Sequence, residues 1–542
     1  MTRKYDEKKI SLEELSETFQ RVYKLCPTLP ILAIHWMHVK HPINSIQKDF
    51  LASNLAGKFI TQSKYSLSYN IVIFIRYFQK IVNRSLRYSR ILFRSVLLFK
   101  NQSLQLIKLR FRFRHEIKLL KKHKFDVIIK SWYVSPTGVD KDKDFYFGDL
   151  QHRLENCGVR ALFLYGDASN GSNSSDFFRT NVSVSNLCRL PELCLISPFD
   201  LFRMLLMQFS TFLRLCRIWV CTSNKLTREV IALASKECLG SSNTFNGMYF
   251  WIGKTASKIW DPQGFITLYE GNSWEKCLRR GIKSASKSCI TVGYQHTAIF
   301  PYNLTLLKPN PDPLSFCVPE VVACLGEQTK RMLEVSHVRL GSSLINFGSF
   351  RFGPTEYSHK SPRQKNKAFL VVPEGTLMES KLLFNYAIQV AISLTDYYFI
   401  FRCHPIFSFS QIRPHLDNNM EIIQNIEISD NHNMFDDIAR SSILLYRSSS
   451  IVLYAILNGL KPFYFCDDHN HHVDPLFELN GWREHVTSVE EMEKVLQRYE
   501  GLTELQLSES WRKAADYVSK YIQPVEDTSI DALLKRLLWS ST

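Results

Sequence analysis

The stretch between residues 399 and 465 decides the fold: FIFRCHPIFSF occupies residues 399–409, and ILLYRSSSIVLYAILNGLKPFYF occupies residues 443–465. Each half begins with a short run of aromatic and β-branched residues, which is typical of a strand buried in a sheet. Each run ends in polar residues and then passes into a loop or a helix. Ligands of open α/β sheets bind at the carboxyl ends of the strands, so we expect ligand-binding groups at these two points.

The first half predicts a strand at Tyr397–Phe401 that carries Arg402, His404 and Pro405 into the loop that follows. A cation, an imidazole and a rigid turn placed together suit an anionic ligand. These three residues are therefore candidates for contact with a phosphate.

The second half predicts a strand at Ile443–Tyr446 and a helix at Ile451–Asn458, joined by Ser448, Ser449 and Ser450. Hydroxyls and unpaired backbone N–H groups at the start of a helix favour a bound phosphate, because the helix dipole is positive there. The alternative is an ordinary capped core helix after a buried strand.

Composition indicates a globular chain with excess positive charge. The 542 residues exceed what one core usually holds, so two domains with an appendage are expected. Lys and Arg number 68 against 51 Asp and Glu, and the formal net charge of +17 favours anionic partners. The thirteen cysteines lack CxxC or zinc-type spacing, and the charged start, MTRKYDEKKISLEEL, has no apolar leader. We therefore expect reduced cysteines and a cytoplasmic location.

Residues 61–124 differ from the rest in charge. They contain sixteen Lys or Arg and one acid, Glu116, interleaved with apolar residues. This pattern suits a helix lying on an anionic membrane surface, and a basic helical hairpin packed on the main body is the alternative. No recognised motif supports nucleic-acid binding, so we predict none. A second apolar helix, Asp200–Val220, is interpreted as either core or a shallow membrane-facing surface; arginines interrupt it, so we do not expect it to span a membrane.

Alternation of apolar runs and helical patterns predicts two doubly wound α/β domains that face each other across a cleft. Among the expected strands are Pro30–Trp36, Glu192–Ile196 and Glu421–Ile423. The expected parts are a strand and basic helical insertion (1–124), a first Rossmann-like domain for the acceptor (125–353), a linker (354–367), a second Rossmann-like domain for the nucleotide donor (368–505) and C-terminal helices (506–542).

Further candidates in the first domain follow its expected strands. Glu270, in the sequence Tyr-Glu-Gly, is a candidate general base, because transfer to a hydroxyl needs a proton acceptor. Gln295 and His296 follow the next strand, and Arg351 precedes the linker; we place these three in the cleft or near the acceptor. Taken singly, Glu270 and His296 are also compatible with structural roles.

The second domain opens with Pro373-Glu374-Gly375. Glu374 is a candidate to accept hydrogen bonds from the ribose or base of a nucleotide, and Gly375 allows a ligand to approach the backbone. An ordinary strand-to-helix turn is the alternative. No metal site is predicted, since a suitably placed DxD pair is lacking and the Asp467–His472 loop has no familiar ligand spacing.

The order Glu270-Gly271, His404-Pro405 and then Ser448–Ser450 resembles the motifs of the bacterial sialyltransferase and polysialyltransferase group. The wider pattern of YEGNSWEK, GYQH, GSFRF, PEG, FRCHP and YRSSS is similar to that of bacterial surface carbohydrate biosynthesis proteins. The resemblance implies a GT-B fold and CMP-activated sugars, with Glu270 as base, His404 on the donor phosphate and the serines binding phosphate. Tyr269 departs from the pattern, which often has a second acid there.

The residues and the resemblance together predict a metal-independent, nucleotide-sugar-dependent glycosyltransferase (EC 2.4) that needs no cofactor. Its partners would be a nucleotide-sugar donor, a glycan or lipid-linked acceptor of lipopolysaccharide or capsule synthesis, and an anionic membrane. It would lie on the inner face of the cytoplasmic membrane. One alternative is a phosphopolyol transferase of the CDP-glycerol type, and another is a catalytically inactive scaffold for glycan assembly.

Overall fold

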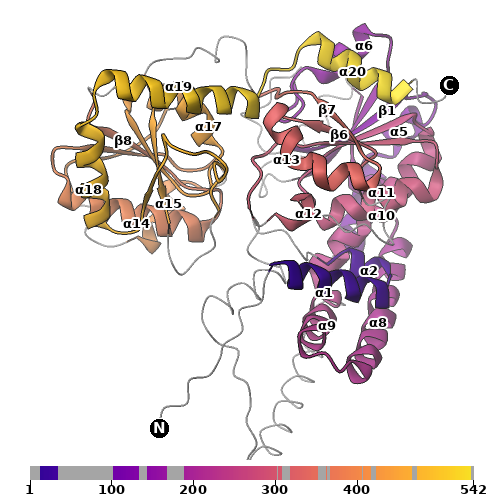
Figure 1. Cartoon of the computed structure of the whole chain (residues 1–542). Coiled ribbons are helices and arrows are strands. Elements are labelled where there is room, and N and C mark those ends of the chain that lie inside the picture. Colours follow the sequence, from indigo (N-terminus) through magenta and orange to yellow (C-terminus); the bar gives the residue numbers. More distant parts are fainter. Residues whose placement is uncertain are drawn as a thin grey trace, which may run out of the picture.

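The helices and strands of the computed structural model form two α/β domains (Figure 1). The structure describes residues 12–34, 102–133, 143–167, 188–301, 303–307, 318–351, 362, 366–405, 407–416, 423–431, 433–466 and 473–538. Most of the basic segment 61–124 and most of the expected linker 354–367 lie outside these residues.

The first domain contains a seven-stranded parallel sheet of order β3-β2-β1-β4-β5-β6-β7. Its strands are β1 (Val127–Tyr133), β2 (Ala161–Asp167), β3 (Cys188–Pro191), β4 (Gly264–Leu268), β5 (Ile290–Tyr294), β6 (Val321–Cys324) and β7 (Ser343–Asn346). Most of their residues are buried, as expected of parallel strands covered by helices on both faces. The strand order reverses between β1 and β4, so the carboxyl ends of these two strands form the topological switch point.

Further helices of the first domain precede β1 or lie between its strands. They are α5 (Arg114–Leu120), α6 (Leu150–Asn156), η1 (Glu192–Leu195), α11 (Ser273–Ala285), α12 (Leu304–Leu307), α13 (Glu327–His337) and η3 (Val338–Leu340). Residues 102–112, which precede α5, are also helical.

A group of helices, here called the helical lobe, extends from the first domain away from its sheet (Figure 1). It comprises α1 (Leu12–Leu25), α2 (Leu29–Leu32), α8 (Pro198–Cys221), α9 (Lys225–Cys238) and α10 (Ser241–Trp260). The long helix α8 begins with a capping box, in which Ser197 and Asp200 bond each other's backbone N–H groups. The lobe joins the domain at α11, because Ser273 donates a hydrogen bond to the carbonyl of Ile34 at 2.6 Å.

The second domain contains a six-stranded parallel sheet of order β10-β9-β8-β11-β12-β13. Its strands are β8 (Ala368–Val372), β9 (Tyr398–Phe401), β10 (Ile426–Ile428), β11 (Ile443–Tyr446), β12 (Lys461–Phe465) and β13 (Glu484–Val486), and its helices are α14 (Leu377–Ser393), α15 (Phe409–Ile412), η5 (Arg413–His415), α16 (Met434–Arg440), α17 (Ile451–Leu457) and α18 (Val489–Glu500). The order again reverses once, between β8 and β11. Each sheet therefore has the strand order of a Rossmann-like domain, as the sequence predicts.

The C-terminal helices α19 (Glu504–Tyr521) and α20 (Asp527–Leu538) connect the two domains. Helix α19 starts on the second domain, where Trp511 bonds the carbonyl of Ile456 in α17, and runs across to the first domain (Figure 1). There the Tyr521 hydroxyl accepts the N–H of Ile299 at 2.7 Å, and α20 packs beside β7. Two Rossmann-like domains joined by a returning C-terminal helix constitute the GT-B architecture.

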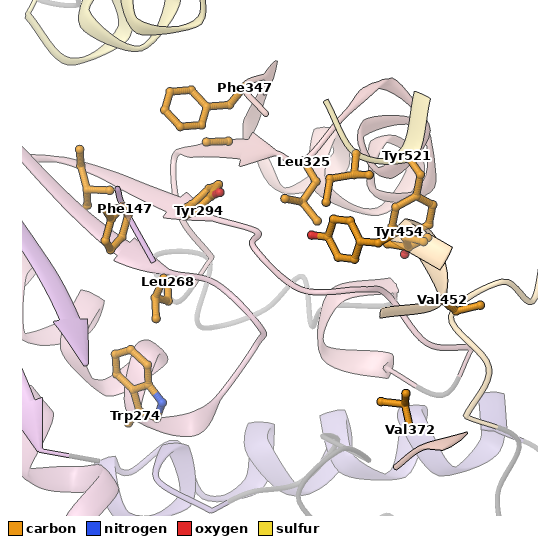
Figure 2. Packing of buried hydrophobic residues seen from close by; sticks show 14 of the residues in the cluster. Phe147, Leu268, Trp274, Tyr294, Leu325, Phe347, Val372, Val452, Tyr454 and Tyr521 are labelled. Atoms are coloured by element: carbon orange, nitrogen blue, oxygen red, sulfur yellow. The ribbon is translucent and has the colours of Figure 1, made fainter. Parts of the chain in front are cut away.

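The domain contact lies at the carboxyl edge of the first sheet. Leu325, which follows β6, accepts the backbone N–H of Gln523 and shares one hydrophobic cluster with Tyr454 of α17 and Tyr521 of α19 (Figure 2). Helix α17 begins at the carboxyl edge of the second sheet. The edges at which the strands end, and where ligands bind in such sheets, are therefore on the side where the domains meet.

Three expected strands are wrong or displaced. Pro30–Trp36 was expected to be the N-terminal strand, but its first residues belong to the buried helix α2, whose second residue is Pro30. The expected strand Glu192–Ile196 is largely the 3₁₀ helix η1, and the true strand, β3, comes just before it. For Glu421–Ile423, residues 421 and 422 lie outside the described residues, and β10 begins only at Ile426.

Candidate functional site

A group of four side chains, here called the first-domain cluster, lies beyond the carboxyl ends of the first sheet: Tyr146, Glu270, His296 and Arg351. Glu270 follows β4, and its Oε1 lies 3.6 Å from Nε2 of His296, which follows β5. The second oxygen, Oε2, accepts a hydrogen bond from the side-chain amide of Asn272 at 3.1 Å. The Glu270 side chain is 14% exposed. It is thus a carboxylate held in a defined position that still reaches the surface.

Aromatic contacts extend this cluster to the loop after β1. The ring of Tyr146 lies edge-on to His296, with centroids 5.1 Å apart. The guanidinium of Arg351 lies over the rings of Tyr146 and Phe145, at 5.0 Å from each centroid. Burial raises the pKa of Tyr146 to about 12, so its hydroxyl stays protonated at neutral pH. Glu270, predicted as the base, thus lies beside His296, and Arg351, predicted with His296 in the cleft or near the acceptor, lies over Tyr146 of the same cluster.

Two buried carboxyl groups fix the loops that carry the cluster. Glu275, in the first turn of α11, accepts the N–H groups of Glu270 and Gly271 at 3.0 and 3.1 Å. Burial raises the pKa of Glu275 to about 7, although the nearby Arg279 opposes the shift. Asp144 accepts the backbone N–H groups of Tyr146 and Phe147, and this arranges the loop after β1.

The contacts that Gln295 makes with other described residues give it a structural role. It is fully buried, its side-chain carbonyl accepts the N–H of Leu325 at 3.2 Å, and its amide donates to the carbonyl of Thr297. These bonds attach the loop after β5 to the end of β6. Gln295 therefore supports the position of His296. Its contacts are with backbone groups inside the first domain, whereas the sequence predicted that it lies in the cleft.

A second group, here called the second-domain cluster, lies at the carboxyl ends of the second sheet: Glu374, Gly375, His404 and Ser448. The Ser448 hydroxyl donates a hydrogen bond to Oε2 of Glu374 at 2.8 Å, which joins the ends of β11 and β8. The His404 ring lies against Gly375, where an added Cβ would be 2.8 Å from its Nδ1 and Cε1. Gly375 thus makes room for His404, whereas the sequence had suggested room for a ligand.

Arg402 and Arg447, which follow β9 and β11, are bound by protein groups. Arg402 pairs with Asp437 at 2.5 Å and also donates to the carbonyl of Asn431. Arg447 is buried, and its Nε lies 2.7 Å from a carboxylate oxygen of Glu379. The prediction that Arg402 binds phosphate therefore competes with a structural role in which Arg402 anchors the loop after β9.

The remaining predicted residues of this region differ in exposure. Ser449 is buried, and its hydroxyl lies 3.4 Å from the N–H of Ile451. Ser450, directly before α17, is partly exposed, and Pro405 is exposed. Ser450 and Pro405 are thus more accessible than Ser448 and Ser449. The Asp467–His472 loop lies outside the described residues.

The two clusters occupy equivalent places in the two sheets. Tyr146 and Glu270 follow β1 and β4, between which the first sheet reverses its order, and Glu374 and Ser448 follow β8 and β11, between which the second does. Ligands of doubly wound sheets bind at such switch points. The geometry therefore offers a partly exposed carboxylate in one domain and a group of hydroxyl, imidazole and carboxylate side chains in the other.

The sequence matches no family model and no curated protein. Among solved structures, the chain is similar to UDP-GlcNAc 2-epimerase from Neisseria meningitidis bound to UDP-GlcNAc, with 10% identity and a TM-score of 0.44 over 76% of this chain and 100% of that one. MurG from Acinetobacter baumannii gives 9% identity and a TM-score of 0.40 over 76% and 99%. The wall teichoic acid polymerase TagF gives 9% and 0.38 over 81% and 97%.

Sequence reasoning missed Tyr146 and Glu275. Tyr146 lies in a loop without periodicity, so nothing local separates it from a core aromatic residue. Glu275 had a detectable signal, because it stands three residues after Asn272 at the start of a helix, the position of the acid in a capping box. Its bonds to Glu270 and Gly271 depend on how the turn after β4 folds back.

Proposed function

We propose that this chain is a glycosyltransferase that moves a sugar from a nucleotide-activated donor to a hydroxyl group of a surface-glycan acceptor. The observation that supports the proposal best is that polar side chains lie at the switch points of both sheets. A partly exposed carboxylate, Glu270, follows the first sheet, and His404 with the Glu374–Ser448 pair follows the second. A transferase needs both a proton acceptor and a site for an anionic leaving group.

In the proposed reaction Glu270 takes the proton of the acceptor hydroxyl. The acceptor oxygen then forms a bond to the anomeric carbon of the sugar, while the bond from that carbon to the donor phosphate breaks and its electron pair leaves with the nucleotide. Asn272 and His296 hold the Glu270 carboxylate in place during this step. General bases of this kind contribute about 10²–10⁴-fold to the rate.

The second domain would bind the donor nucleotide. His404 would donate a hydrogen bond to the departing phosphate, assisted by Ser450 at the start of α17 and by backbone N–H groups there. Glu374, which already bonds Ser448, would accept hydrogen bonds from the nucleotide's ribose or base. Positive and hydrogen-bonding groups that face the developing phosphate charge stabilise the transition state.

The resemblance stated from the sequence favours a CMP-linked donor and an acceptor of the lipopolysaccharide or capsule type. We place the reaction at the inner face of the cytoplasmic membrane, because such acceptors are carried on lipids and because residues 61–124 are strongly basic.

A nucleotide screen tests the proposal. CMP, CDP, UMP and UDP are each added in excess, and the nucleotide of the donor should raise the melting temperature more than the others do. A ligand that binds only the folded state stabilises it by mass action. Release of that nucleotide from its sugar conjugate, measured in the presence of glycan acceptors, should follow. If nucleotide is released from CDP-glycerol and from no sugar conjugate, the protein is a phosphopolyol transferase and not a glycosyltransferase. If no nucleotide stabilises the protein and none is released from any donor, the proposal is wrong.

A further inference from the structure

Helix α8 carries a continuous apolar stripe on its outer face. Its members recur at alternating intervals of three and four residues, and each is exposed: Phe199, Phe202, Leu206, Phe209, Leu213, Cys216 and Val220. The five largest side chains of the stripe are between 45% and 58% exposed. Scattered apolar residues on a surface need no explanation, but a contiguous stripe along six turns marks an interaction site.

The inner face of the same helix is already used. Leu201, Met204, Gln208, Thr211 and Leu215 are buried against the rest of the helical lobe. Gln208 donates to Asn243 and accepts from Thr244, so polar groups on this face have partners within the protein. By length and composition α8 could cross a membrane. Its attachment along one side indicates a helix that lies flat on a surface instead.

Charge decides which partner the stripe fits. Arg203, Arg214 and Arg217 follow one border of the stripe and are exposed, and the guanidinium of Arg203 lies 4.3 Å from the ring centroid of Phe199. Asp200 is the single acid of α8, and its carboxylate is bonded to Ser197. An apolar face bordered by arginines matches acyl chains bordered by anionic headgroups.

Other occupants are disfavoured by the same charges. A second copy of this chain carries a net charge of +17 and is repelled at long range. Residues 61–101 of the same chain hold eight Lys or Arg and no acid, so they would be repelled by the arginines of α8 as well.

We propose that the outer face of α8 docks the protein on the surface of an anionic lipid bilayer. The inference rests on the membrane location in the proposed function and is independent of its transfer chemistry. Docking through α8 would hold the first domain at the membrane, because the lobe that contains α8 is bonded through the carbonyl of Ile34 to Ser273, three residues from Glu270. A lipid-linked acceptor is the substrate class that such a site receives.

The test compares binding of the full-length protein to vesicles of phosphatidylglycerol and phosphatidylcholine. The variant Phe202→Gln, Leu206→Gln, Phe209→Gln should lower the partition coefficient roughly tenfold or more, because apolar burial contributes to interfacial binding. The control, Val335→Gln, Met378→Gln, Leu505→Gln, alters apolar residues outside the stripe that are more exposed than those of the stripe variant, and it should bind as wild type. High salt should leave most of the difference between the two variants, since it screens only the charges.

A second measurement uses native cysteines. Cys216 belongs to the stripe, whereas the exposed Cys157 follows α6 on another part of the first domain. Vesicles should slow the reaction of Cys216 with a membrane-impermeant thiol reagent and leave that of Cys157 unchanged, as read by mass spectrometry of the two peptides.

Four results overturn the inference: no vesicle binding by the wild-type protein, equal vesicle binding by the two triple variants, equal labelling of Cys216 with and without vesicles, or a dimer in sedimentation that the stripe variant dissociates. Nucleotide binding is read separately by melting temperature. If the wild-type protein binds nucleotide but does not bind vesicles, the docking surface is wrong and the transferase proposal stands. Absence of nucleotide binding with α8-dependent docking intact would defeat the transferase alone.

Discussion

At the residue scale, the buried carboxyl group of Glu275 holds the turn that carries Glu270. Its pKa is raised from 4.5 to about 7 by burial. The folded protein therefore binds more protons than the unfolded chain between these pH values, and the free energy of unfolding decreases as pH rises through this window. In the wild type this decrease should amount to about 3 kcal/mol. In Glu275→Gln the side chain cannot ionise, so the decrease should be absent.

Urea unfolding at pH 5 and pH 8 measures this difference. Glu509→Gln, which replaces an exposed carboxylate by an amide, is the control for the change of charge. A Glu275→Gln profile as steep as that of the wild type would show that Glu275 does not titrate in this window.

Gly375 tests the position of His404. A Cβ at this residue would lie 2.8 Å from the imidazole, so Gly375→Ala should displace the ring and weaken nucleotide binding roughly tenfold, which corresponds to about 1.4 kcal/mol. Gly501→Ala is the control, because its Cβ would meet nothing nearer than 3.5 Å. Calorimetric titration with the nucleotide identified in the screen provides the measurement. Unchanged affinity in Gly375→Ala would remove His404 from the donor site.

At the element scale, helix α16 anchors the loop that carries His404. Asp437 accepts hydrogen bonds from Arg402, Ser429 and Asn431, which come from the ends of β9 and β10. Asp437→Asn leaves the guanidinium of Arg402 without its charge partner and should lower the free energy of unfolding by about 2–3 kcal/mol. This value allows for the 17% exposure of the Arg402 side chain. The urea midpoint gives the measurement.

The exposed pair of Glu427 and Arg440 is the natural comparison for this network. Glu427→Gln breaks an ion pair at the surface and should cost at most about 1 kcal/mol. If the two variants lose equal stability, α16 does not anchor the loop in the way described.

The strands of both sheets that are buried on two faces could be predicted, because continuous apolar runs such as Ile443–Tyr446 have few other interpretations. Edge strand β7 was missed, since its partly exposed residues carry no such run. The run after Pro30 misled because a short, fully buried helix and a buried strand have the same apolar pattern. Residues after strand ends could be proposed as site residues, but whether Arg402 faces a ligand or Asp437 depends on α16, which is distant from it in sequence.

At the scale of the whole molecule, the return of the chain through α19 and α20 couples the two domains. Gly348 has φ of +101°, and a Cβ there would lie 2.4 Å from the carbonyl oxygen of Pro524, directly after α19. Gly348→Ala should therefore loosen this connection and separate the unfolding of the domains into two transitions. Scanning calorimetry, together with urea unfolding followed by two probes, measures the coupling.

Gly158 provides a matched control for backbone strain. It also has positive φ, +77°, but nothing lies within 4 Å of an added Cβ. Gly158→Ala should cost only the strain of about 1–2 kcal/mol and keep a single transition. Two transitions in both variants, or in neither, would contradict the role given to the α19–α20 connection.

The central assignment is Glu270 as the group that accepts the proton of the acceptor hydroxyl. Glu270→Gln keeps the size of the side chain and can still accept from Asn272, so the fold and the nucleotide affinity should persist. The most direct measurement is single-turnover transfer from the identified donor by wild type and Glu270→Gln, with nucleotide affinity determined on the same samples. We predict that transfer falls by about 10²–10⁴-fold at unchanged affinity. Wild-type transfer by Glu270→Gln would contradict the assignment and, with it, the joint action of the two clusters.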